Sequence, residues 1–225
     1  TLDKYIGDAI VAFYGAPAPV KNQEKKACST AIVMQHKLEF LRNKWKKENN
    51  WPEIVYNMQH RIGLNSGKMV TGNMGSEMRM NYTMMGDTVN LAARLEPAAK
   101  QYGVYIFVGE NIYNESNDEF VFRFLDFLKV KGKNIPIKSY ELIETKNDVT
   151  KESLDLIEKF EKGLDQYFKQ EWDSAIDLFE QSRLLEKMFE GRNTNPSSVF
   201  IKRCKYFKEN PPGENWDGVW EMKNK

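Results

Sequence analysis

Residues 81–96 constrain the fold of this chain more than any other segment. Residues 82–85 are apolar and β-favouring, and Gly86 interrupts them before a stretch with helical spacing. Asp87 follows the glycine and is predicted to cap the first free amides of that helix. The sequence therefore predicts a strand, a tight turn and a helix in direct succession.

Two polar residues on the predicted helix are candidates for ligand binding. Asn90 and Arg94 are four residues apart, so their side chains project from the same face. An amide and a guanidinium beside a helix N-terminus suit a ligand with ribose hydroxyls and phosphate oxygens. An Asn and an Arg with this spacing are more often part of a solvated surface, and the spacing alone leaves both interpretations open.

A family resemblance favours the functional interpretation. Gly-Asp-Thr-Val-Asn-Leu-Ala-Ala-Arg-Leu-Glu at residues 86–96 closely resembles the signature of the class III nucleotide cyclases. Lys-Tyr-Ile-Gly-Asp at residues 4–8 and Val-Lys-Gly-Lys at residues 130–133 match the family in order and spacing. The resemblance implies an α+β, ferredoxin-like fold over residues 1–147, with a mixed, mainly antiparallel sheet and packed helices.

The resemblance also implies a function, which is the conversion of ATP to cyclic AMP and pyrophosphate. Lys4 would donate a hydrogen bond to N1 of adenine, and the hydroxyl of Thr83 would accept one from the exocyclic amine. Threonine at this position is typical of one branch of adenylate cyclases. Guanylate cyclases carry an acid where this chain has Lys4, so a guanylate cyclase is the less favoured alternative.

The remaining site residues are assigned by the same resemblance. Asn90 would orient the ribose and Arg94 would stabilise charge on the α-phosphate. Lys131 would bind the triphosphate, with Lys133 as the alternative. A catalytically degenerate cyclase fold that serves only in dimerisation or regulation is the competing hypothesis from another class.

Metal binding and dimerisation follow from the resemblance as well. Two Mg²⁺ or Mn²⁺ ions per site and a homodimer with shared sites are implied, with Asp8 as one metal ligand. A Gly-Asp pair between two short strands is by itself an ordinary hairpin turn. If the strand is regular up to the turn, Lys4 and Asp8 lie on one face. The family's other metal carboxylate lies some tens of residues before Asp8, so we expect the native protein to continue upstream of Thr1.

The composition narrows the classes of function. Lysine plus arginine number 33 against 32 acidic residues, which gives no reason to expect binding to nucleic acid or to an acidic membrane. Only two histidines are present, which argues against a Ser-His-Asp hydrolase and a histidine-rich metal site. No apolar run approaches the ~18 residues of a membrane span. Two distant cysteines, Cys28 and Cys204, are expected to be reduced in a cytoplasmic protein or in the cytoplasmic portion of a membrane-anchored one.

Two helical regions are predicted outside the signature segment. Residues 22–48 should form a long helix whose apolar stripe faces the core. Residues 148–225 should form a small all-α domain, in which residues 163–179 resemble one tetratricopeptide helix pair. Such a single unit cannot bury its own apolar face, so we expect it to pack on the cyclase domain or on a protein partner. The aromatic residues 216–220 are expected to dock as a tail.

Overall fold

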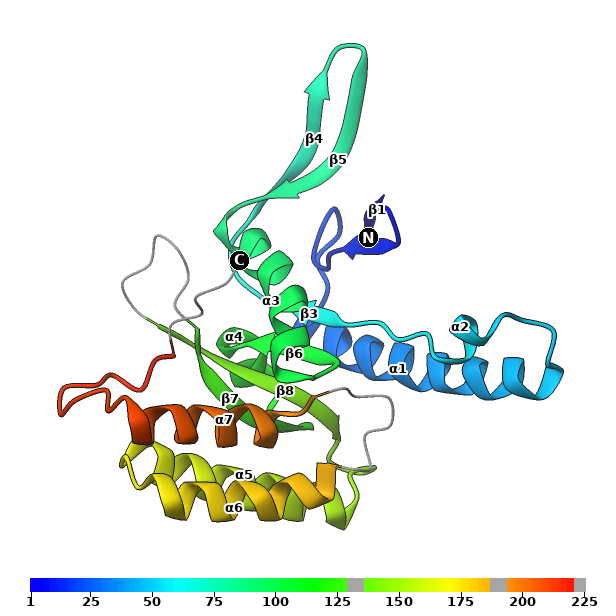
Figure 1. Ribbon diagram of the computed structural model, residues 1–225. Helices are drawn as coiled ribbons and strands as arrows, with labels where there is room; N and C mark the ends of the chain where they lie inside the picture. Colours follow the sequence, from blue (N-terminus) through cyan, green and yellow to red (C-terminus); the bar gives the residue numbers. More distant parts are fainter. Residues whose placement is uncertain (129–135, 187–193, 221–225) are drawn as a thin grey trace.

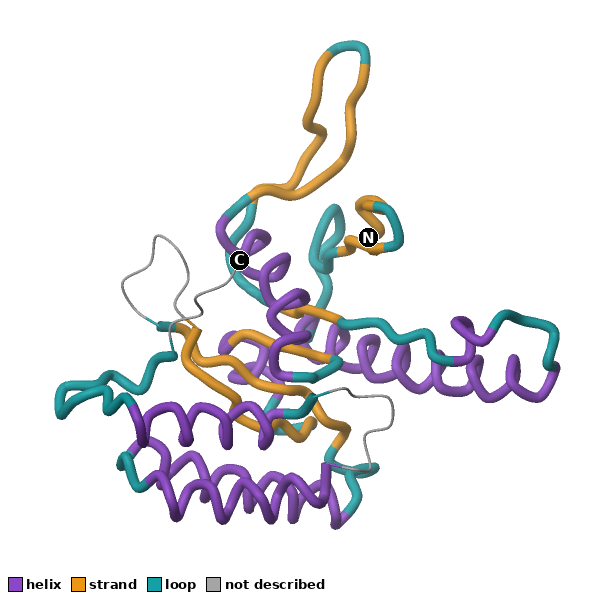
Figure 2. The backbone as a smooth tube through the Cα atoms, in the orientation of Figure 1, coloured by secondary structure: helices purple, strands orange, loops and turns teal. Residues whose placement is uncertain are grey.

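The computed structural model describes residues 1–128, 136–186 and 194–220 (Figures 1 and 2). The strands within these residues are β1 (Leu2–Ile6), β2 (Ala9–Ala12), β3 (Ile62–Leu64), β4 (Val70–Ser76), β5 (Arg79–Met85), β6 (Ile106–Gly109), β7 (Phe120–Leu128) and β8 (Ile137–Thr145). The helices are α1 (Gln23–Glu48), α2 (Glu53–Tyr56), α3 (Asp87–Tyr102), α4 (Glu110–Ser116), α5 (Lys151–Phe168), α6 (Trp172–Leu185) and α7 (Pro196–Glu209). No helix of the described ranges combines the length and apolar character needed to cross a bilayer.

The central sheet has the strand order β3-β6-β8-β7. β3 runs parallel to β6, whereas β6 and β7 both pair with β8 in antiparallel fashion. The predicted mixed, mainly antiparallel sheet is therefore confirmed. Because side chains alternate along a strand, Phe107 of β6 belongs to one core cluster while Ile106 and Val108 belong to the other.

Helices cover both faces of this sheet. On one face, Cys28, Ala31 and Ile32 of α1 pack with Ile112 of α4 against the strands. On the other face, α3 shares a single cluster with α5, α6 and α7, and Figure 1 shows the last three stacked along that side. Trp216 and Trp220 pack against the same cluster. The C-terminal helices α5, α6 and α7 thus form one core with α3.

Two strand pairs stand apart from the central sheet. β1 and β2 form one antiparallel hairpin, and β4 and β5 form another. Figure 1 shows the β4–β5 ribbon projecting away from the rest of the chain. Apolar side chains on these two ribbons are more than half exposed, namely Leu2, Tyr5, Ile6, Ile10, Val70, Met78, Met80 and Met85.

Helix α1 differs from its prediction in one respect. Its buried residues lie only in the first half; of the later stripe residues, Met34 is 38% exposed, and Leu38, Leu41 and Trp45 are only partly buried. Figure 1 shows the reason, because the distal half of α1 extends beyond the edge of the sheet. The expectation that the whole apolar stripe faces the core is wrong.

The predicted capping of α3 by Asp87 is corrected. The N-cap of α3 is Gly86, whose positive φ of 145° turns the chain into the helix, and Asp87 is the first helical residue without a capping hydrogen bond. An acid in this first turn still complements the helix dipole. At α5 the Thr150 hydroxyl caps the helix by accepting a hydrogen bond from the Ser153 amide.

Both cysteines are free, buried thiols. Burial raises the pKa of each, Cys28 and Cys204, to about 12. They are therefore neutral at ordinary pH, and they serve as small apolar residues of the two core clusters.

Candidate functional site

Lys4 and Thr83 meet although 79 positions separate them in sequence. The ammonium Nζ of Lys4, in β1, donates to the hydroxyl Oγ1 of Thr83, in β5, over 3.2 Å. Thr83 is buried, whereas the Lys4 side chain is 45% exposed. The pair combines a fixed hydroxyl with a cation that still has protons to donate.

Asp3 joins this pair, and the sequence analysis did not single it out. Thr83 Oγ1 donates to Asp3 Oδ2 over 2.9 Å, and Lys4 Nζ lies 3.4 Å from the same oxygen. The Asp3 side chain is only 2% exposed, and its second oxygen, Oδ1, is buried and has no hydrogen-bond partner among the described residues. We call Asp3, Lys4 and Thr83 the hairpin triad.

Strand alternation explains why Asp3 was missed. Neighbouring residues of a regular strand point to opposite faces, so Asp3 and Lys4 are not expected to share a partner. In β1, however, the pairing with β2 shifts register between Leu2 and Lys4. Such a bulge re-aims side chains, and here both reach Thr83. An acid directly before the lysine was the one available signal.

Asp8 lies at the tip of the same hairpin. β1 ends at Ile6, and Gly7 takes the positive φ of 63° that the two-residue turn requires. Asp8 is exposed and makes no hydrogen bond or ion pair within the described part of the chain. Because Asp8 belongs to the turn, strand alternation does not set its direction, and the expected shared face with Lys4 does not follow.

Asn90 and Arg94 occupy the first two turns of α3. Both are exposed, and neither makes a hydrogen bond or ion pair with another described residue. Thr83 lies four residues before the first residue of this helix. Residues 84–86 are therefore all that separates Thr83 of the hairpin triad from the helix that carries Asn90 and Arg94. The donors of Asn90 and Arg94 remain available to a ligand.

The two lysines assigned to triphosphate binding, Lys131 and Lys133, lie outside the described residues.

The fit to a divalent cation is incomplete within one chain. Asp8 offers free carboxylate oxygens, which are ligands that Mg²⁺ and Mn²⁺ prefer. The described residues hold no group of three or more His, Cys, Asp or Glu side chains placed to bind a metal ion. Asp8 can supply one ligand, and the remaining ligands have to come from elsewhere, such as nucleotide phosphates or a second chain.

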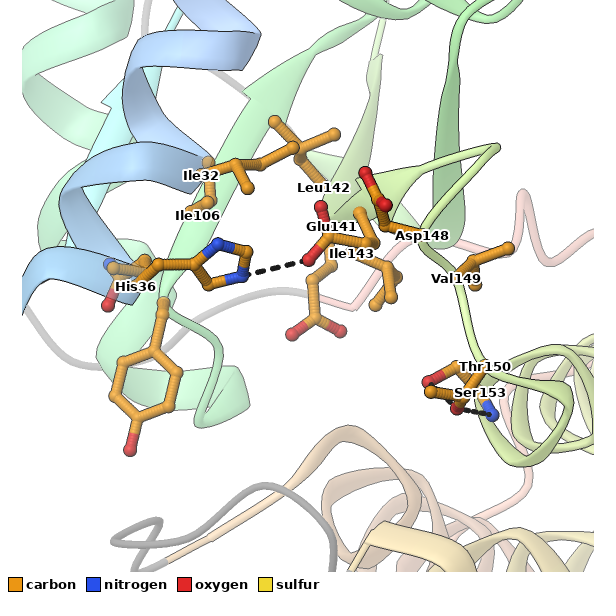
Figure 3. A pocket seen from close by; sticks show the side chains of 13 residues that line it. Ile32, His36, Ile106, Glu141, Leu142, Ile143, Asp148, Val149, Thr150 and Ser153 are labelled. Atoms are coloured by element: carbon orange, nitrogen blue, oxygen red, sulfur yellow. Dashed lines mark hydrogen bonds and ion pairs between the residues drawn. The ribbon is translucent and has the colours of Figure 1, made fainter. Parts of the chain in front are cut away.

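Two cavities lie away from these residues. One of about 220 Å³ is bounded by α1, β6, β8 and the start of α5 (Figure 3), where His36 Nε2 lies 2.9 Å from Glu144 Oε2. This is below the roughly 300–1,000 Å³ of typical small-molecule sites. Another of about 660 Å³ lies between the end of α3, α7 and residues 212–220. Neither is lined by Lys4, Asp8, Thr83, Asn90 or Arg94.

Comparison with known proteins finds a family match for about the first two thirds of the chain. A family model described as "Adenylate and Guanylate cyclase catalytic domain" matches residues 4–144. The crystal structure of the adenylyl cyclase CyaB from P. aeruginosa is similar, with a TM-score of 0.57 and 29% sequence identity. That similarity covers 67% of this chain and 74% of the other.

Two curated relatives are adenylate cyclases by name. The Dictyostelium discoideum protein "Adenylate cyclase, terminal-differentiation specific" is 30% identical over 90% of this chain, so the similarity extends into the C-terminal helices. "Adenylate cyclase 1" of Rhizobium meliloti is 32% identical over 64% of this chain. The chain spans only 9% and 21% of the length of these two proteins, respectively.

Proposed function

Because the chain belongs to the family of adenylate and guanylate cyclase catalytic domains, we propose that it converts ATP to 3′,5′-cyclic AMP and pyrophosphate. The observation that carries this proposal is the 3.2 Å contact between Lys4 and Thr83. These two residues match the family positions that read the purine, and their contact places a donor for N1 beside an acceptor for the exocyclic amine of adenine. The names of the relatives support the same substrate.

In the proposed reaction the ribose 3′-hydroxyl oxygen attacks the α-phosphorus of ATP. A bond from that oxygen to the phosphorus forms, the bond from the phosphorus to the bridging oxygen of the β-phosphate breaks so that pyrophosphate leaves, and the hydroxyl proton passes to solvent water. Asn90 holds the ribose so that the attack is in line. Arg94 donates to the α-phosphoryl oxygens, where negative charge develops. Both side chains are exposed and have no hydrogen-bond or ion-pair partner among the residues that the structure describes, as these roles require.

Asp8 would supply one carboxylate ligand for divalent metal, and bound metal would neutralise triphosphate charge and make the 3′-hydroxyl more acidic. Lys131, or alternatively Lys133, holds the β- and γ-phosphates. A magnesium site formed from few protein carboxylates plus substrate phosphates is common in nucleotide chemistry.

We propose that the site is shared between two copies of the chain. Asp8 of one copy serves the nucleotide that is held by Lys4, Thr83, Asn90 and Arg94 of the other. The exposed apolar side chains of the two projecting ribbons support a homodimer, because monomeric proteins rarely leave such surfaces uncovered.

The domain division also remains a proposal. Residues 1–147 would be the cyclase domain, and residues 148–225 a helical domain that resembles one tetratricopeptide pair. The end of the family match at residue 144 supports this boundary. The close approach of Gly163 to the Phe179 ring supports the helix-pair comparison, because a Cβ at Gly163 would lie 2.7 Å from that ring.

The experiment is a cyclase assay with complementation. The chain, expressed with the sequence that flanks it in its gene, is incubated with ATP and Mn²⁺, and cyclic AMP is measured by chromatography. Asp8→Ala and Arg94→Ala should each be inactive, and mixing them should restore part of the activity because one intact composite site can form. Folded variants that exchange subunits without any recovery would argue against shared sites. A wild type that dimerises but forms no cyclic nucleotide would leave the regulatory alternative.

A further inference from the structure

The chemistry of the hairpin triad fixes the direction of one hydrogen bond. An ionised carboxylate can only accept hydrogen bonds and an ammonium can only donate them. The Thr83 hydroxyl lies between Asp3 Oδ2, at 2.9 Å, and Lys4 Nζ, at 3.2 Å. Its proton must therefore point to Asp3, and one of its lone pairs receives a proton from Lys4. What Thr83 has left for a ligand is a lone pair.

This direction matters because adenine and guanine present opposite patterns. Adenine offers a donor at its exocyclic amine and an acceptor at N1, whereas guanine offers an acceptor at O6 and a donor at N1. A Thr83 hydroxyl whose proton were free could turn and donate to O6 of guanine. With the proton committed to Asp3, O6 would face a lone pair and remain unsatisfied, which is costly in a buried site.

Burial makes the commitment strong. Thr83 is 8% exposed and the Asp3 side chain 2% exposed, so water does not compete for the hydroxyl proton. Asp3 Oδ1 is buried without a partner among the described residues. An under-satisfied buried carboxylate binds each donor within reach more tightly, and unpaired buried polar groups in native structures often have a functional reason.

We propose that Asp3 is a positioning residue for base specificity: it holds the Thr83 hydroxyl as an acceptor toward the base and so makes the site reject guanine. The inference rests on the proposed function, because it assumes that Lys4 and Thr83 face the purine. Asp3 itself is not assigned any contact with the nucleotide.

The test is the ratio of the dissociation constants for GTP and ATP, measured by competition against a fluorescent nucleotide. Asp3→Val removes the acceptor and suits a strand. It frees the Thr83 proton and should lower the ratio about fivefold, since one mismatched hydrogen bond is worth on the order of 1 kcal/mol. Asp118→Val is the matched control, because it also removes an acid beside a lysine, but one that is 63% exposed and remote in sequence. Its ratio should equal that of the wild type.

A second variant separates positioning from packing. In a Thr83→Val background no hydroxyl remains to be oriented, so adding Asp3→Val should change the ratio less than twofold. If Asp3→Val does not fold, Asp3→Thr replaces it. The hydroxyl of the new threonine can donate to Thr83 and free its proton, so the single variant should again lower the ratio of the two dissociation constants. An unchanged ratio, or an equal loss of affinity for both nucleotides, would overturn the inference.

The two proposals fail in different ways. A wild type that binds ATP in preference to GTP but forms no cyclic nucleotide contradicts the proposed function and leaves the role of Asp3 intact. A wild type that cyclises ATP while Asp3→Val keeps the full preference for ATP contradicts the role of Asp3 alone.

Discussion

Asp3 and Asp126 each lie at the centre of a polar cluster, but the two clusters differ in how many of their hydrogen bonds are made. Asp126 Oδ2 accepts from the Tyr102 hydroxyl and the Arg203 guanidinium, each at 2.5 Å, and Asp126 Oδ1 accepts from the Phe127 amide. All of these side chains are buried except Phe127, which is partly so. In the hairpin triad one carboxylate oxygen of Asp3 has no partner within the described part of the chain, and Lys4 is almost half exposed.

We call Tyr102, Asp126 and Arg203 the closed cluster, and it has a structural consequence. Through Asp126 it joins β7 to the C-terminal end of α3 and to α7, so the C-terminal helices hold the helix that carries Asn90 and Arg94. Burial is the largest single influence and would lower the pKa of the Arg203 guanidinium, but the Asp126 carboxylate and the Tyr102 and Tyr167 hydroxyls together raise that pKa above its ordinary value. The guanidinium therefore stays charged at any ordinary pH. The comparison teaches that a buried carboxylate with both oxygens paired fixes helices, whereas one with an oxygen unpaired among the described residues leaves acceptor capacity beside a possible ligand.

The largest expected effect is on the closed cluster. Arg203→Met keeps the packing volume but leaves Asp126 as a buried charge without its counter-ion, which should lower the free energy of unfolding by about 3–5 kcal/mol. Denaturant unfolding followed by circular dichroism measures this. Lys202→Met, an exposed neighbour on the same helix, is the control and should change stability by less than about 0.5 kcal/mol. Equal effects of the two variants would show that the cluster is not structural.

In contrast to Arg203→Met, Arg94→Ala should strongly lower turnover and change the free energy of unfolding little. Loss of a donor to the developing charge typically lowers kcat about 10²–10³-fold. Because Arg94 is exposed and unpaired among the described residues, unfolding should shift by less than about 0.5 kcal/mol. Lys100→Ala, an exposed cation of the same helix, is the control. A loss of stability that matches the loss of turnover would contradict a role in the reaction.

Lys4→Glu tests the hairpin triad directly. The change removes the donor for N1 of adenine and places a second carboxylate beside Asp3, so kcat/KM for ATP should fall about tenfold or more. Steady-state rates with ATP and GTP measure it. A variant that keeps its rate with ATP would show that Lys4 does not face the base.

The smallest expected effect concerns the packing of α5 on α6. Gly163→Ala adds a Cβ that would lie 2.7 Å from the buried Phe179 ring. Overpacking costs typically 1–3 kcal/mol, and the better helix propensity of alanine offsets about 1 kcal/mol of this. We expect a net loss of about 1 kcal/mol in thermal unfolding. A gain in stability would mean that the two helices are free to separate.

Much of the fold could be predicted because strong local signals mark it. Gly86 interrupts an apolar run directly before a helical pattern, and the strand, turn and helix follow as predicted. The burial of α1 was overestimated, since periodicity identifies an apolar face but not how far the sheet beneath it extends. The helix pair that was expected around residues 163–179 corresponds to α5 and α6.

The candidate site was only partly accessible from the sequence. Lys4, Thr83, Asn90 and Arg94 were assigned through family motifs, and the structure brings the first two into contact. Asp3 could not be found in this way, because its contact with Thr83 depends on a bulge and on a pairing across 80 positions. Non-local hydrogen bonds of this kind leave no periodic trace in a sequence.

The most direct test of the account is the choice between two substrates. The wild-type protein, expressed with its flanking sequence, is given ATP or GTP with Mn²⁺, and kcat/KM for each cyclic product is compared. The account predicts cyclic AMP as the main product, with ATP preferred over GTP by at least about tenfold, since a mismatched base leaves buried polar groups unpaired. A preference for GTP would contradict the assignment of Lys4 and Thr83 as the residues that recognise adenine.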